Sequence, residues 1–282
     1  MVYTPVTKNA IRFCYQVHAG QLDKAGLPYV NHPLHLAEQM TTEDEACVAL
    51  LHDVMEDCGA TPGELLALGI SPEALAAVQL LTHKDGVPYL DYVRAVGENP
   101  IARRVKVADL RHNSDLTRLD EVGQKNLARL RKYRKARVIL GDMATEVQTP
   151  AGPVALAVAG EPYPFVVRDE SDGAFTLEAD VLPLSVGEKV ELRYDFGPAV
   201  AQGASERGVW HVYQAGGVTV GVTLATAPVA AAPAPTYRLD SDAATVTVTA
   251  DPVAHRRDAG ANSFTVRVAW RRGTSEEDVH AV

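Results

Sequence analysis

The stretch ALLHDVMEDCG, residues 49–59, decides how the first half of the chain folds. It opens with three apolar residues and then places His52, Asp53, Glu56 and Asp57 within six positions. Residues four apart on an α-helix share one face, so we expect His52 to lie above Glu56 and Asp53 above Asp57. Carboxylates this close repel one another unless a positive charge stands between them. The stretch therefore predicts a partly buried helix face that holds a metal ion.

Apolar residues recur at helical spacing throughout residues 1–146. Ser71 and Asn99 each stand directly before a proline, as helix N-caps do, and Pro33 also fits a first helical turn. We therefore expect an all-α helical bundle. The runs that carry this pattern are AIRFCYQVHA, PLHLAEQM, EACVALLHDVMED, PEALAAVQLLTH, YLDYVRAV, IARRVKVADLRHNSDL and NLARLRKYRKARVIL.

Residues 147–282 read differently, because β-branched residues alternate there in short runs that glycine and proline separate. Seven such runs at roughly ten-residue spacing favour an antiparallel β-sandwich or a small barrel, and we expect a sandwich-like domain. The run TAPVAAAPAPTY, residues 226–237, is expected to be an extended connection within this domain. The alternative is a boundary there, which would leave 236–282 as a separate piece. The strand runs are PFVVRDE, AFTLEADV, KVELRYDF, GVWHVYQ, VTVGVTLAT, ATVTVTADPV and SFTVRVAWRR.

Composition places the chain among soluble globular proteins, with 46% apolar and 22% charged residues. No apolar run is long enough to cross a membrane, the first residues do not resemble a secretory signal, and the three cysteines show no CxxC spacing. We therefore expect a cytoplasmic protein. The net charge is −9, and residues 147–282 hold 10 Lys and Arg against 17 Asp and Glu. General nucleic-acid binding is not expected of such an acidic chain.

Two further polar residues stand inside apolar surroundings, far from the opening stretch in sequence. His32 directly precedes a proline that starts a helix, and Asp109 follows the apolar run VKVA. Together with His52 and Asp53 they offer two imidazoles and two carboxylates. This mixture of nitrogen and oxygen donors suits manganese, iron, cobalt or zinc better than calcium or magnesium. Packed helices can bring such separated positions to one site.

Four motifs in this order carry a resemblance: HAGQ, KAGLPYVNHP, ALLHDVMED and VKVADLRHN. They resemble the HD-domain metal-dependent phosphohydrolases. The resemblance is greatest to the hydrolase domain of RelA/SpoT-type proteins and to their small stand-alone relatives, which degrade guanosine tetra- and pentaphosphate. It covers about residues 8–140, so it implies an HD-type domain over 1–146 and leaves an accessory β domain over 147–282. It also implies a small nucleotide as substrate and removal of its 3′-pyrophosphate.

The resemblance also implies roles for single residues. His32, His52, Asp53 and Asp109 match the metal ligands, usually of manganese. Glu56 and Asp57 match the acidic pair that orients or deprotonates the attacking water. Lys24 and Asn113 match positions that contact the nucleotide. Simpler interpretations stand beside these: a helix-capping histidine, a buried aspartate that is only hydrogen-bonded, and an acidic pair that merely supports the ligands.

One position departs from the family pattern, because Asp23 stands where the relatives have a basic residue that lies against the guanine base. A different nucleotide phosphate is therefore an alternative substrate. Two other classes stay open: a nucleotide sensor without turnover, and a chain whose main activity is partner binding or self-association through the β domain. The basic run 125–137, which includes Arg129 and Lys132, is either a phosphate contact or a solvated helix face.

Overall fold

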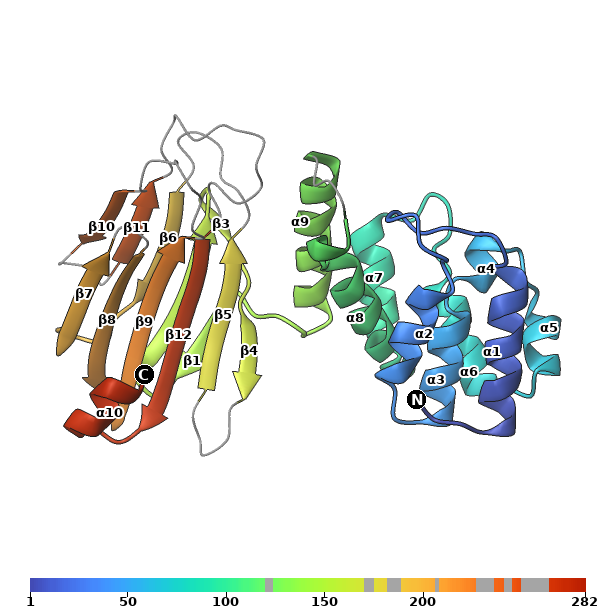
Figure 1. The fold of residues 1–282 in the computed structure, drawn as a ribbon, viewed down its shortest axis with the longest axis horizontal. Helices are drawn as coiled ribbons and strands as arrows, with labels where there is room; N and C mark the ends of the chain where they lie inside the picture. The colour runs from blue at the N-terminus through green and yellow to red at the C-terminus, as the bar shows by residue number, and fades with distance from the viewer. Residues whose placement is uncertain are drawn as a thin grey trace. The chain divides into compact units, whose positions relative to one another are not determined.

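The computed structural model describes residues 1–119, 124–169, 175–181, 189–205, 208–226, 236–240, 245–249 and 264–282. The chain divides into two compact units, Met1–Asp142 and Met143–Val282, which are coloured blue to green and green to red in Figure 1. Each unit has its own hydrophobic core. Among the described residues, no helix is both long and apolar enough to span a bilayer.

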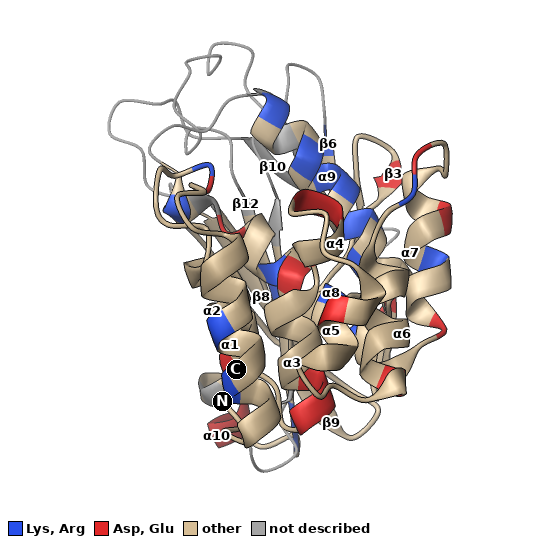
Figure 2. Cartoon of the chain, turned by 90° about the vertical axis from the view of Figure 1, so that its right-hand side faces the viewer, with Lys and Arg blue, Asp and Glu red and all other residues tan. Residues whose placement is uncertain are grey.

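The first unit is helical, as the sequence predicts. Its central helix is α3, where Ala46 to Leu51 are all buried, and α1, α2, α6 and α8 pack around it. Figure 2 shows acidic residues on α4 and a series of Lys and Arg along α9. The helices are α1 (Pro5–Val17), α2 (Asn31–Glu38), α3 (Glu43–Leu51), α4 (Val54–Asp57), α5 (Pro62–Ala67), α6 (Pro72–Leu81), α7 (Tyr89–Gly97), α8 (Pro100–Ser114) and α9 (Gln124–Ile139), with the short 3₁₀ helix η1 (Leu116–Arg118).

The predicted helix starts are confirmed at α6 and α8. The Ser71 hydroxyl accepts a hydrogen bond from the Ala74 N–H at 2.9 Å, and the Asn99 side-chain oxygen accepts one from the Ala102 N–H at 2.9 Å. A proline follows each cap at the first helical position. These caps satisfy N–H groups that have no partner within the helix.

The stretch 49–59 is not one helix, so the expected stacking of His52 on Glu56 is wrong. α3 ends at Leu51, and α4 begins again at Val54. The His52 imidazole Nδ1 lies 2.8 Å from the carbonyl oxygen of Ala49, the oxygen that the N–H of Asp53 would use in an unbroken helix. The side chain therefore replaces a backbone hydrogen bond, and His52 and Asp53 lie in a turn.

The second unit contains two antiparallel sheets. One has the order β1-β2-β6-β11-β10, with β3 paired to β2, and the other has the order β4-β5-β12-β9-β8-β7. The strands are β1 (Glu146–Thr149), β2 (Gly152–Val158), β3 (Glu161–Pro162), β4 (Val166–Asp169), β5 (Phe175–Val181), β6 (Lys189–Tyr194), β7 (Ala201–Ser205), β8 (Gly208–Ala215), β9 (Val218–Thr226), β10 (Thr236–Asp240), β11 (Thr245–Thr249) and β12 (Phe264–Arg272), and α10 (Glu276–Ala281) follows them.

All seven predicted strand runs contain a strand of this unit. Buried side chains of both sheets, such as Leu192 of β6 and Val268 of β12, belong to one hydrophobic core. The segment 236–282 supplies strands to both sheets, because β11 pairs with β6 and β12 lies between β5 and β9. Most of the predicted connection 226–237 lies outside the described residues.

Candidate metal centre and substrate pocket

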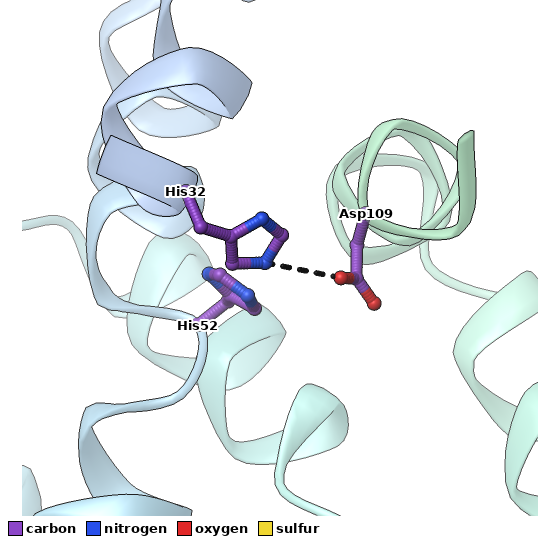
Figure 3. A group of neighbouring side chains, drawn as sticks. All are labelled: His32, His52 and Asp109. Carbon is purple, nitrogen blue, oxygen red and sulfur yellow. Dashed lines mark ion pairs between the residues drawn. The ribbon is translucent and has the colours of Figure 1, made fainter. Parts of the chain in front are cut away.

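Three polar side chains from separate elements converge in the interior of the helical unit. His32 comes from α2, His52 from the turn after α3, and Asp109 from α8, and all three are buried. Each offers one ligand atom, and these atoms lie within 4.8 Å of one another. Figure 3 shows the two imidazole rings next to the carboxylate, with His32 Nε2 lying 3.2 Å from Asp109 Oδ1. The cluster joins positions that are 77 residues apart in sequence.

His52 presents a ring nitrogen that is suited to a metal ion. Its Nδ1 donates to the Ala49 carbonyl, which leaves a lone pair on Nε2 in the neutral ring. Within the described part of the chain, this buried Nε2 makes no hydrogen bond, although it lies 2.9 Å from Asp53 Oδ2. Burial lowers the pKa of His52, but the carboxylates of Asp53 and Asp109 outweigh burial and raise the pKa to about 9. A positive charge is therefore favoured at this nitrogen.

Asp53, the fourth predicted ligand, lies beside His52 and does not belong to the group of three. Its Oδ2 also accepts a hydrogen bond from the hydroxyl of Tyr29, a residue of the GLPYVNHP motif for which no role was predicted. Burial raises the pKa of Asp53, but His52 and the Tyr29 hydroxyl overcome this and lower the pKa to about 2. The carboxylate is thus held in its charged form next to the cluster.

Asp109 is held by two neighbours on its own helix. Lys106 Nζ lies 2.8 Å from Oδ2, and Asn113 Nδ2 lies 2.5 Å from Oδ1. Burial opposes the charged form, yet Lys106 and His32 lower the pKa of Asp109 well below its usual value. Sequence reasoning assigned no role to Lys106, although a lysine inside the apolar run VKVA was a visible signal. Asn113 was predicted to contact the nucleotide, and in the structure it donates a hydrogen bond to this carboxylate.

A pocket with a volume of about 460 Å³ opens over the cluster, and it brings together the remaining predicted site residues. Its wall includes Lys24, Glu56, Asp57 and Asn113 as well as His32, Asp53 and Asp109. Arg118 and Arg129 also line it. Burial and the nearby Arg129 lower the pKa of Lys24. Lys132, in contrast, lies over the ring of Tyr89, with Nζ 4.2 Å from the ring centroid.

The two predicted water-handling carboxylates lie on α4, at the side of this pocket. Glu56 Oε2 accepts a hydrogen bond of 2.9 Å from the backbone N–H of His83, which fixes that carboxylate. Burial, Asp53 and Glu56 together raise the pKa of Asp57. A carboxylate with a raised pKa is a better proton acceptor than an unperturbed one.

Asp23 does not face the pocket as a free charge. Its Oδ2 accepts a hydrogen bond of 2.6 Å from Arg118 Nη2, and its Oδ1 accepts bonds from the N–H groups of Ala25 and Leu27. Burial opposes the charged form, but these donors together lower the pKa of Asp23. Arg118 was not predicted as a site residue, because only the three-dimensional fold brings it to Asp23.

Comparison with known proteins identifies relatives of the helical unit. No protein-family model matches the chain. The guanosine-3′,5′-bis(diphosphate) 3′-pyrophosphohydrolase MESH1 of Mus musculus is 31% identical over 140 residues, which cover 45% of this chain and 77% of that protein. A GTP pyrophosphokinase of Myxococcus xanthus is 30% identical over 142 residues, or 44% of this chain. The chain spans only 18% of the length of that kinase.

A solved structure of a metazoan ortholog of SpoT, which hydrolyses ppGpp and plays a role in starvation responses, is 24% identical to this chain. The likeness covers 50% of this chain and 88% of that chain with a TM-score of 0.42, so the sequence relatives carry the assignment. With 31% identity across 77% of a MESH1 protein, the chain belongs through its helical unit to the RelA/SpoT-type hydrolase family that includes MESH1.

Proposed function

We propose that the helical unit is a divalent-metal-dependent phosphohydrolase of a phosphorylated nucleotide. The observation that carries this proposal is the convergence of His32, His52 and Asp109, whose ligand atoms lie within 4.8 Å of one another at a pocket lined by both acids and cations. The leading reaction is removal of the 3′-pyrophosphate from guanosine tetra- or pentaphosphate, the reaction named for the MESH1 relatives.

The residues present fit a metal ion. His52 Nε2 is a buried ring nitrogen without a hydrogen bond in the described part of the chain, and Asp53 Oδ2 lies 2.9 Å from it. The neighbouring carboxylates favour a positive charge at this nitrogen, and a metal ion that takes the place of the proton would supply that charge. His32, His52 and Asp109 would hold the ion, with Asp53 as the fourth ligand. The mixed nitrogen and oxygen set suits Mn²⁺, and also Zn²⁺, Fe²⁺ or Co²⁺. When bound, such a cation lowers the pKa of a coordinated water and screens the charge of phosphate oxygens.

The residues around the cluster would handle the attacking water, bind the substrate and position a ligand. Asp57, whose pKa is raised, accepts a proton from the attacking water, and Glu56, fixed by the His83 N–H, orients that water. Lys24 and Arg129, which are cations in the pocket wall, bind the negatively charged phosphate oxygens of the substrate. Asn113 keeps the Asp109 carboxylate in place.

A specific observation supports a second substrate class. Asp23 stands where the family pattern has a basic residue against guanine, and its carboxylate is paired with Arg118, so position 23 offers no cation to that base. A nucleotide phosphate with another base is therefore the alternative substrate. A nucleotide sensor without turnover is the alternative activity. The acidic pair on α4 argues against it, because a sensor needs no carboxylates to handle an attacking water.

We test this function by incubating purified protein with a panel of nucleotides, including guanosine tetraphosphate, in the presence of Mn²⁺. We expect release of pyrophosphate or phosphate that stops on chelation and returns with Mn²⁺. Glu56→Gln and Asp57→Asn should each lower turnover by about 10²- to 10⁴-fold. Asp91→Asn, at an exposed acid on α7 outside the pocket, is the matched control. Equal turnover in wild type and both pocket variants would refute catalysis, and a tightly bound but unchanged nucleotide would indicate a sensor.

We propose an accessory role for the β unit, predicted as residues 147–282, and we propose that its two sheets form a sandwich around their common core. Its titratable groups do not form a metal cluster among the described residues. Self-association or partner binding is the activity that this unit would add, and size-exclusion chromatography with light scattering measures the first of these.

A further inference from the structure

His112 lies between two other histidines and contacts one of the proposed metal ligands. Its ring lies close to those of His32 and His35, with centroid separations of 4.8 Å and 4.5 Å. Its Nδ1 lies 2.7 Å from His32 Nδ1 and 3.1 Å from Arg118 Nη1. Two facing ring nitrogens at 2.7 Å need one proton between them, and the pair alone does not decide which ring carries it.

Arg118 decides the direction of this hydrogen bond. A guanidinium group only donates, so the contact with Arg118 Nη1 requires an unprotonated Nδ1 on His112. His32 must then carry the proton on its own Nδ1 and donate it to His112, whose single Nδ1 lone pair is shared by the two donors. In neutral His32 the lone pair is consequently on Nε2, the atom that lies 3.2 Å from Asp109 Oδ1 inside the cluster.

The position of Arg118 is itself fixed from two sides. Nη1 also donates to the carbonyl oxygen of His112 at 3.1 Å, and Nη2 donates to Asp23 Oδ2 at 2.6 Å. Only 11% of the Asp23 side chain and 25% of the Arg118 side chain are exposed. Asp23 is anchored in turn by the N–H groups of Ala25 and Leu27. A continuous set of hydrogen bonds thus runs from the loop at the pocket rim to His32.

We propose that Asp23, Arg118 and His112 are positioning residues that fix the tautomer of His32 and so prepare its Nε2 to bind the cation. This inference rests on the proposed function in one respect, that His32 is a metal ligand. Ligating histidines generally donate their second ring N–H to an acceptor that sets the tautomer, and here that acceptor is another imidazole. Asp23 thereby has a positioning role in place of the guanine contact that the family's basic residue makes.

The first test needs no metal. Selective ¹⁵N-histidine labelling of the metal-free full chain reports which ring nitrogens carry protons. We expect a protonated Nδ1 on His32 and an unprotonated Nδ1 on His112, with loss of this fixed pattern in Arg118→Met. A protonated Nδ1 on His112 in the wild type would overturn the proposal, whether or not the protein hydrolyses a nucleotide.

The second test measures Mn²⁺ affinity by titration. His112→Phe keeps a ring between its neighbours but removes the acceptor, so we expect it and Arg118→Met to weaken Mn²⁺ binding about 10- to 100-fold. His112→Asn places an oxygen near the position of Nδ1 and should restore most of the affinity. His35→Phe is the matched control, because it changes the exposed ring on the other side of His112.

The outcomes separate the two proposals. Wild-type affinity in both His112→Phe and Arg118→Met would overturn the positioning network while leaving the metal site intact. If the wild type binds no Mn²⁺, the proposed function fails, and the histidine spectra of the metal-free protein still decide the network. Far-UV circular dichroism verifies that each variant is folded, and recovery in His112→Asn distinguishes a lost acceptor from general damage.

Discussion

The helical unit and the β unit both bury polar side chains, but they do so in different ways. In the helical unit the buried groups touch opposite charges: His32 and Lys106 both contact Asp109, and His52 lies beside Asp53. In the β unit they complete local structure. The hydroxyl of Thr219 donates to the carbonyl of Gly273, and Asp278 lies at the cap of α10.

Two buried histidines show the consequence. Carboxylates overcome burial and raise the pKa of His52 to about 9, whereas burial alone lowers the pKa of His211 in β8. Buried charges cost folding free energy, and they cluster in proteins where chemistry uses them. The difference teaches that burial of a histidine does not by itself mark a site, and that the charged neighbours around it do.

The largest effect should come from Lys106→Met, which removes the largely buried cation that pairs with Asp109 at 2.8 Å. An unpaired buried carboxylate is left behind, so we expect the metal-free helical unit to lose about 3–5 kcal/mol of unfolding free energy. Urea unfolding followed by circular dichroism at 222 nm measures this loss. Both tryptophans of the chain, Trp210 and Trp270, lie in the β unit, and their fluorescence transition should stay unchanged.

The matched control for Lys106 is an ion pair with the same spacing on the neighbouring helix. Arg94 and Asp91 are also three residues apart, but their side chains are 60% and 58% exposed. We expect Arg94→Met to cost less than about 1 kcal/mol. Equal losses in the two variants would show that the charges around Asp109 are ordinary surface charges, and the contrast between the units would fail.

Leu192→Ala tests the other side of the comparison. Leu192 is fully buried in β6, where its side chain belongs to the core that both sheets share. Its truncation should destabilise the β unit by about 2–5 kcal/mol, measured by tryptophan fluorescence during urea unfolding. Mn²⁺ binding and nucleotide hydrolysis by the helical unit should stay at wild-type values. A parallel loss of Mn²⁺ affinity would mean that the β unit takes part in the site, contrary to its proposed accessory role.

Local signals in the sequence were enough to predict much of the fold. Caps such as Ser71 and Asn99, each followed by proline, act within one helical turn. The start of the helix can therefore be predicted without the tertiary structure. Alternating runs such as VTVGVTLAT predict strands for the same reason, and β9 spans that run. The strands β3 and β7 contain no β-branched residue, so this signal is absent there and both were missed. The strands β1, β2 and β10 were missed as well.

The candidate site was predictable only in part. Its motif residues were named because the family pattern includes them, but contacts between distant segments were not. The turn at His52 arises because its side chain takes the Ala49 carbonyl, a competition that periodicity does not reveal. The pairing of Asp23 with Arg118 joins positions 95 residues apart. Because of this pairing, Asp23 is one partner of an ion pair and not a free negative charge at the pocket.

The smallest expected effect concerns pH and the lone buried histidine of β8. The folded-state pKa of His211 is lowered by burial, so below pH about 6.5 the unfolded chain binds protons that the folded chain excludes. The β unit should therefore lose stability as the pH falls below about 6.5, and His211→Gln should make that decline shallower. Urea unfolding by tryptophan fluorescence at a series of pH values measures the slope.

His280→Gln, at an exposed histidine of α10, is the control. An unchanged slope in His211→Gln would show that other groups cause the acid sensitivity of this unit. Burial of His211 would then not explain how the two units differ.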